Sequence, residues 1–202
     1  SGAGSYTNSG TVQIAKLYTP QSGTLTNSGT LRFLSTSATA VATIDLTPAN
    51  TGTISGSIIA ERFVPVAGTN QHYVSSPVDA PSLSAQFGAT GTPGFVVPLA
   101  NCDETQLSNA SPYGTVFRYT EYYGNGCSLR GWEVLTSGNA DNGRGYSVYL
   151  PGTTSTPWSL SGSANMGSTY ALSGLKNSNW TNTTLQGRTQ NSGWSLVGNP
   201  YL

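Results

Sequence analysis

Charge is the scarcest property of this sequence. Asp, Glu, Lys and Arg make up 8% of its 202 residues, and the net charge is zero, whereas ordinary soluble domains contain about 25% charged residues. A chain this neutral has no long-range attraction for nucleic acid or anionic lipid, so we exclude both as partners. Its solubility must come from Ser, Thr, Asn, Gln and Gly. This composition is common in extracellular proteins and surface filaments, so we expect an extracellular or cell-surface location.

Long apolar runs and helical periodicity are also missing. No apolar run has the length needed to span a membrane, so membrane insertion is not expected. No stretch keeps apolar residues at the helical spacing for three turns, because Gly, Ser and Thr interrupt every candidate. A signal-peptide pattern is absent as well, which predicts a chain that has been processed or cut from a longer one.

Cysteine and histidine are too few for a tetrahedral metal site, since the chain has two Cys and one His. In an oxidising compartment Cys102 and Cys127 would form one disulfide, which would contribute about 3 kcal/mol in the chain-entropy model. The alternative is two buried free thiols. We expect no cofactor. Calcium is considered at Asp103-Glu104 and at Asn139–Asn142, but neither has the EF-hand spacing, and an Asx turn explains the second.

What the sequence does contain is short runs of Val, Ile, Thr and Tyr between Gly, Asn and Pro clusters, which predicts an all-β fold. Residues 1–52 are assigned to a Ser/Gly/Thr-rich β module. A short phrase recurs at its turns, in which Gly allows the turn and Thr opens a strand. The four copies are Ser9-Gly10-Thr11-Val12, Ser22-Gly23-Thr24-Leu25, Ser28-Gly29-Thr30-Leu31 and Thr51-Gly52-Thr53-Ile54.

Two arrangements fit this first module. One is a solenoid-like cap, in which successive rungs stack on each other, and the other is an antiparallel meander. The expected strands are Thr11–Tyr18, Leu25–Leu34 and Ala40–Leu46. Edge strands this neutral would tend to pair with another chain, either as a hazard or as a means of assembly.

Residues 53–202 are assigned to a second module, an antiparallel β-sandwich, and truncation at its C-terminal end is left open. Its first expected strand is long, Thr53–Phe63, and Pro65 ends it. Asn142-Gly143 predicts a tight turn. The other expected strands are Gln71–Ser75, Thr115–Tyr123, Gly131–Leu135, Gly145–Leu150, Trp158–Leu160, Thr169–Leu172, Thr183–Gln186 and Trp194–Val197.

Three phrases in this second module, in this order, resemble phrases of large secreted and cell-surface proteins of Bacteroidota. They are Ile58–Pro65 with His72–Val78, then Gly143–Pro151, then Gly193–Tyr201. The resemblance implies export by the type IX secretion route and an adhesin-like role without assigned chemistry. The last phrase usually continues into more domain and a terminal sorting domain, neither of which follows here. We therefore expect a segment of a longer chain.

No carboxylates lie in a recognisable hydrolase motif. Glu121 and Glu133 are on adjacent expected strands and could act as a glycosidase acid and base, although solvated or Arg-paired strand residues explain them more simply. His72 and Asp79 could join a serine in a triad, but no G-x-S-x-G elbow is present. We expect no catalytic residues and no enzyme, with glycoside hydrolysis as the remaining alternative.

Sugar binding is the main alternative function. Tyr122, Tyr123, Trp158 and Trp180 lie near Gly, Asn or Ser, and aromatic faces beside polar groups suit sugar rings. The competing interpretation places these rings in the core. We expect a non-catalytic structural or adhesive segment that assembles through strand pairing, with a filament as one form of the assembly. Its partners would be copies of itself or other surface proteins. The runner-up is a carbohydrate-binding module that recognises polysaccharide.

Overall fold

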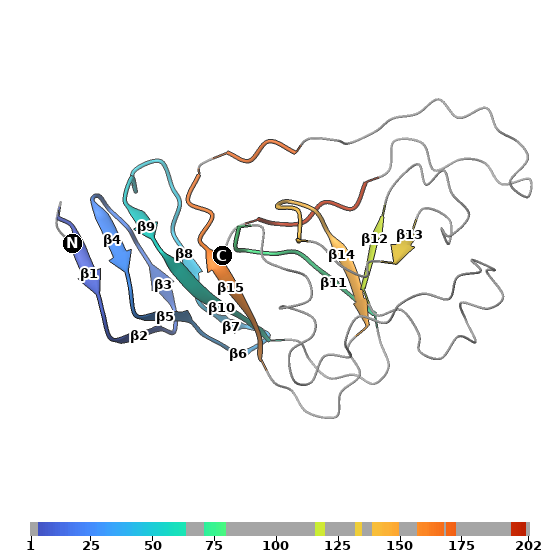
Figure 1. Cartoon of the computed structure of the whole chain (residues 1–202), viewed down its shortest axis with the longest axis horizontal. Coiled ribbons are helices and arrows are strands. Elements are labelled where there is room, and N and C mark those ends of the chain that lie inside the picture. Colours follow the sequence, from blue (N-terminus) through green and yellow to red (C-terminus); the bar gives the residue numbers. More distant parts are fainter. Residues whose placement is uncertain are drawn as a thin grey trace, which may run out of the picture.

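The computed structural model describes residues 4–63, 71–79, 116–119, 132–134, 139–149, 157–167, 169–172 and 195–200. Within these ranges about half of the residues lie in strands and none lies in a helix. The expectation of a mainly β chain is therefore confirmed. Figure 1 shows the N-terminal strands stacked side by side at one end and a separate group of strands at the other.

The N-terminal strands form three coils that stack in parallel. The first coil contains β1 (Tyr6–Asn8), β2 (Thr11–Ile14) and β3 (Leu17–Tyr18), and the second contains β4 (Thr24–Asn27), β5 (Thr30–Phe33) and β8 (Thr43–Ile44). The third contains β9 (Thr53–Ser55) and β10 (Ser57–Phe63). Stacking produces the sheet orders β1-β4-β9, β2-β5-β10 and β3-β8, all with parallel pairing. This is a solenoid arrangement, and an antiparallel meander is wrong for these strands.

The recurring phrase marks two corners of the coils. Thr11 pairs with Thr30, so the Ser9 and Ser28 copies of the phrase occupy one corner in successive coils. Thr24 pairs with Thr53, so the Ser22 and Thr51 copies occupy the other. At this second corner the two threonine hydroxyls lie 3.0 Å apart. The stacking continues past Gly52 to Phe63, because β9 and β10 pair with β4 and β5.

Two glycines explain why expected long strands are divided. The expected strand Thr53–Phe63 is interrupted at Gly56, which has a φ of 99°, a conformation that side chains other than Gly rarely adopt. The expected strand Leu25–Leu34 turns a corner at Ser28-Gly29, where both amides donate to the Asn8 carbonyl oxygen. A hairpin of β6 (Ser35–Ser37) and β7 (Ala40–Val41) lengthens the second coil.

At the far end of the stack, an antiparallel strand covers the edge of β10. β15 (Pro157–Ser163) pairs along all seven residues of β10, from Ser57 opposite Ser163 to Phe63 opposite Pro157. Its Leu160 is fully buried. The sheet order β15-β10-β5-β2 therefore has β15 at one edge and β2 of the first coil at the other.

The second group of strands forms an antiparallel sheet of order β11-β14-β12-β13. Its members are β11 (Gln71–Val74), β14 (Tyr146–Tyr149), β12 (Val116–Tyr119) and β13 (Trp132–Val134). Paired residues of an antiparallel sheet share a face. Val148 and Val116 pair on one face and Ser147 and Phe117 on the other, and all four are buried. A sandwich remains a prediction for this part.

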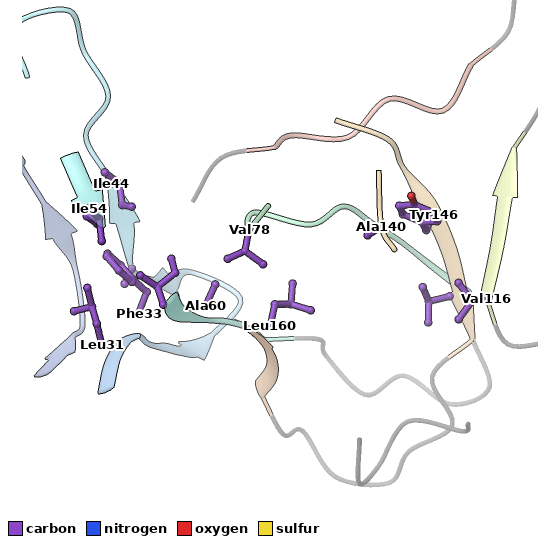
Figure 2. Packing of buried hydrophobic residues seen from close by; sticks show 13 residues of the cluster. Leu31, Phe33, Ile44, Ile54, Ala60, Val78, Val116, Ala140, Tyr146 and Leu160 are labelled. Atoms are coloured by element: carbon purple, nitrogen blue, oxygen red, sulfur yellow. The ribbon is translucent and has the colours of Figure 1, made fainter. Parts of the chain in front are cut away.

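One cluster of buried side chains joins the coils to this sheet. Figure 2 shows Leu31, Phe33, Ile44 and Ile54 gathered among the coil strands, and Val116, Ala140 and Tyr146 at the antiparallel sheet. Val78 and Leu160 lie between the two groups, and Val78 forms an isolated bridge with Ala164. Packing of this kind holds the coils and the sheet in contact.

Candidate functional site

The first coil (residues 4–18) has the most open apolar surface of the coil stack. Among the described residues, β1, β2 and β3 each pair with the second coil along one edge, and no strand pairs with the other edge. None of residues 4–18 is buried. Val12 is 41% exposed, whereas Leu31, which stacks on it, is 1% exposed. Tyr6 is 58% exposed, whereas Ile54, in the same column, is 8% exposed. The coil interior therefore opens to solvent at this end.

The open edges of β1 and β2 carry none of the charges or prolines that usually keep edge strands apart. Natural edges are blunted by Lys, Pro, bulges or inward-pointing charges. Residues 4–15 contain no Asp, Glu, Lys, Arg or Pro, and Lys16 comes only at the corner after β2. Hydroxyl and amide groups cover the strands instead. A neutral edge of this kind can pair with another strand without bringing like charges together.

An asparagine ladder ties the first coil to the next. The Asn8 side-chain amide donates to Asn27 Oδ1 at 2.7 Å and to the Thr30 carbonyl oxygen at 3.1 Å. Asn27 in turn donates to the Ser57 carbonyl oxygen of the third coil at 2.5 Å. The bonds run in one direction along the stack. Side-chain amides thus satisfy backbone groups at a corner where strand hydrogen bonds stop.

The one largely buried carboxylate among the described residues has a structural set of partners. Glu61 of β10 is 7% exposed, and its Oε1 lies 2.5 Å from Arg32 Nη1 of β5. Its Oε2 accepts the Ser35 amide at 3.2 Å, and the Ser35 hydroxyl accepts the Phe63 amide at 2.8 Å. These contacts fasten the second coil to the third at the start of the inserted hairpin.

A polar junction (Ser75, Asp79, Asn142, Asn165 and Pro200) brings the Gly143 phrase and the Gly193 phrase against His72–Val78. Asn142 donates to Asp79 Oδ1 and, at 3.2 Å, to Asn165 Oδ1. Asn165 donates to the Pro200 carbonyl oxygen at 2.5 Å, and Ser75 donates to that of Asn199 at 2.8 Å. The phrases are therefore joined in space, and amide groups rather than ionised pairs dominate the contact.

Residues around the same turn give Tyr146 an unusual environment. Tyr146 is 1% exposed, and its hydroxyl accepts the Asp141 amide at 2.6 Å. Burial raises the pKa of Tyr146 from 10.0 to about 12, although the hydrogen bond from Asp141 opposes this rise. Nearby, Asp141 pairs with Arg118 at 3.2 Å. Asp141 is exposed, so this pair contributes little to stability.

Alkaline unfolding should reveal this buried phenol. In the unfolded chain Tyr146 ionises near its ordinary pKa of 10.0, and in the folded chain near 12. The stability gained by keeping it neutral is present in full below pH 10 and is lost as the pH rises towards 12. Urea unfolding at increasing pH should show this loss, and Tyr146→Phe should flatten part of it. An identical alkaline decline in both proteins would contradict the assignment.

The residues predicted for sugar binding and for the disulfide fall mostly outside the described ranges. Tyr122, Tyr123 and Trp180 lie outside them, as do Cys102 and Cys127. The backbone of Trp158 is in β15, opposite Arg62. Its side chain is outside the description. The predictions for these residues therefore stay predictions.

The residues considered for catalysis are described only in part. Glu121 lies outside the described ranges, and the backbone of Glu133 is in β13, opposite Arg118. His72 is in β11, opposite Val148, while Asp79 accepts a hydrogen bond from Asn142. Of the calcium candidates, Asp103-Glu104 lies outside the description. Within it, no group of three or more His, Cys, Asp or Glu side chains could hold a metal ion.

Sequence reasoning missed the residues that define the open end. Tyr6 belongs to β1, a strand that the sequence did not predict. Val12 was expected in a strand, but the sequence did not indicate that its inward-pointing side chain is exposed to solvent. The available signal was the Ser-Gly-Thr phrase itself, whose first copy, at residue 9, marks a corner within the first coil. No described helix is long and apolar enough to cross a membrane.

Comparison with known proteins gives no relative from which a function can be taken. No family model, curated protein or solved structure matches this chain.

Proposed function

We propose that this chain is a non-catalytic structural or adhesive segment of an extracellular or cell-surface protein. It works through strand-to-strand contact with copies of itself or with another surface protein. The observation that carries this proposal is the open first coil, whose strand edges meet no other strand within the described ranges and whose apolar columns end in solvent at Tyr6 and Val12. Unpaired backbone groups beside exposed apolar side chains form a template for another strand.

The near absence of charge also supports a contact role. Catalysis by ionisable groups needs them close together and held in position, whereas Glu61 and Asp79 are occupied by structural partners. A surface covered by hydroxyl and amide groups makes contacts that depend little on ionic strength. The second sheet supplies the buried face that a sandwich needs, at Val116 and Val148, although its other face is covered as well at Phe117 and Ser147. We include the sandwich and the type IX export route in the proposal.

Sedimentation of the whole chain over a range of concentrations tests this proposal. Reversible association is expected, and Val12→Lys should weaken it by about tenfold or more, because a buried ammonium group lacks a partner at the contact. Thr26→Lys, on the exposed side of the second coil, is the matched control that should leave association unchanged. Electron micrographs would distinguish fibres from discrete particles.

Two results would count against the proposal. One is a chain that stays monomeric at every concentration and captures no surface protein. The other is glycan binding that Trp158→Ala abolishes while association is unaffected, a result that would favour a carbohydrate-binding module.

A further inference from the structure

The glycines at the corners of the coils point to a specific kind of partner. At the corner before β5, a Cβ on Gly29 would overlap the carbonyl oxygen of Gly10 in the first coil. At the corner before β4, a Cβ on Gly23 would overlap the carbonyl oxygen of Gly4. At the corresponding corner before β9, a Cβ on Gly52 would lie 2.7 Å from the carbonyl oxygen of Pro20. The second and third coils therefore need glycine because the backbone of the preceding coil approaches too closely for a side chain.

The first coil carries glycine at the same two corners, where nothing in the described structure requires it. A Cβ on Gly10 would meet no atom within 4 Å, and one on Gly4 would meet only the ring of Tyr6, at 3.8 Å. Neither glycine has the positive φ of Gly23. Glycine in an open, unstrained position gives up conformational entropy for no packing benefit. These two positions suit a coil that is itself covered by the backbone of another.

Three other features of the first coil continue the internal coil interfaces outward. Its inward side chains Tyr6, Val12 and Ile14 begin the columns that are buried further along the stack. No strand in the described part of the chain pairs with its outer edges. Asn8 donates to Asn27, so an asparagine of a preceding coil would donate to Asn8 Oδ1 in the same direction. Asn8 Oδ1 accepts only the Gly10 amide among the described contacts, at 3.1 Å, which leaves a lone pair for this bond.

We propose that the open end of the first coil binds another β-coil, stacked in parallel and in register. This inference rests on the proposed function and names the partner chemistry. The coil would place aliphatic or aromatic residues over Tyr6 and Val12, and an amide side chain over Asn8. Its backbone would lie against Gly4 and Gly10. A head-to-tail stack of copies of this chain is not the source, because β15 covers the edge of β10 on which β2 would have to pair.

The test adds a coil of this chemistry to the whole chain. Successive coils are offset by 19 residues at Asn8 and Asn27, so a second set of residues 4–22 is inserted directly before Gly4. Backbone amides of the original β1 and β2 should then exchange with solvent more slowly, by about tenfold or more. The melting temperature should rise by about 3 °C or more. An insert with the same residues in scrambled order is the control and should produce neither effect.

Alanine at Gly10 separates close parallel stacking from any looser contact. In the original chain, Gly10→Ala should leave the melting temperature unchanged or raise it slightly, because alanine loses less conformational entropy than glycine on folding. In the extended chain, the same substitution should cancel most of the gain, because its Cβ would now face the inserted backbone. Equal protection by the scrambled insert, or an extended chain indifferent to Gly10→Ala, would overturn the inference.

The outcome is distinguishable from failure of the proposed function. Association that Val12→Lys weakens, with no stabilisation by the inserted coil, would leave the contact role standing and reject the parallel coil as partner. A concentration-dependent dimer of the original chain that tolerates Gly10→Ala would likewise reject it, in favour of a second copy paired head to head.

Discussion

Phe33→Ala should lower the free energy of unfolding by about 3–5 kcal/mol, the range for removing a large aromatic side chain from a packed core. Phe33 is fully buried inside the second coil, stacked between Ile14 and Ala60, and its ring meets that of Tyr18 edge to face, with centroids 6.2 Å apart. Few neighbouring side chains can collapse into the space, because coil backbones hold both sides. Denaturant unfolding followed by Trp fluorescence would measure the loss.

The first coil supplies a matched control for this substitution. Val12 also points into the coil interior but is 41% exposed, so Val12→Ala should cost well under 1 kcal/mol, as expected for a residue near the surface. Phe33→Leu should cost about 1.5 kcal/mol or less, since most of the volume is kept. If Val12→Ala and Phe33→Ala were equally costly, the interior would be closed at the first coil and the description of an open end would be wrong.

Glu61→Ala should lower the free energy of unfolding by about 2–3 kcal/mol. The substitution removes the ionic partner of Arg32 and the hydrogen-bond acceptor of the Ser35 backbone amide. Ser35 is fully buried, so water cannot replace this acceptor. Stranding a buried donor costs about 1–3 kcal/mol. Because the Arg32 side chain is 32% exposed, water replaces part of its lost contact, so the effect stays below the range for a fully buried pair.

Glu61→Gln separates the charge from the hydrogen bonds. The amide oxygen can still accept from Ser35 or Arg32, so this variant should lose about half as much stability as Glu61→Ala, since neutral hydrogen bonds are weaker than charge-assisted ones. Both variants should be measured by urea unfolding at neutral pH. Equal losses for Gln and Ala would indicate that the ionic contact alone matters, and no loss for Ala would contradict the structural role of Glu61.

Local pattern was enough to predict strands, but not their partners. Alternation of apolar and polar residues looks the same in parallel and antiparallel sheets. The spacing between the four Ser/Thr-Gly-Thr phrases is irregular, because two different corners alternate in one series and because the β6–β7 hairpin lengthens the second coil. Sorting the phrases by corner requires the register, which pairs Thr11 with Thr30 and Thr24 with Thr53.

Strand ends were predicted less well, for reasons specific to each position. Ala15-Lys16 divides the expected strand Thr11–Tyr18, because the chain turns a corner there. Trp158–Leu160 grew into β15 because β10 offers a seven-residue edge. Thr169–Leu172 is not a strand, and in the described part of the expected strand Trp194–Val197, residues 195–197, only Val197 forms a bridge, with Arg144. Pairing with a distant segment decides each of these strand bounds, and local propensity carries no information about that pairing.

The candidate site shows the same division. Low charge and neutral strand edges indicated a contact role, and they are visible in the sequence. The partner of Glu61 could not be predicted from the sequence, since Arg32 is 29 residues away and belongs to another coil. The uncovered inward face at Tyr6 and Val12 depends on which coil comes first in the stack, and this is a property of the assembled coils.

Closure of the stack by β15 has a consequence for the order of folding. The coils are built from residues 4–63, whereas the strand that seals β10 comes from residues 157–163, about a hundred positions later. Contacts between coils are nearer in sequence and form sooner, and distant pairing must first meet the entropy of closing a long loop. A ribosome making roughly 5–20 residues per second needs several seconds to reach β15. Throughout that interval the nascent chain exposes a second, temporary strand edge along β10, which is where a chaperone would be needed most.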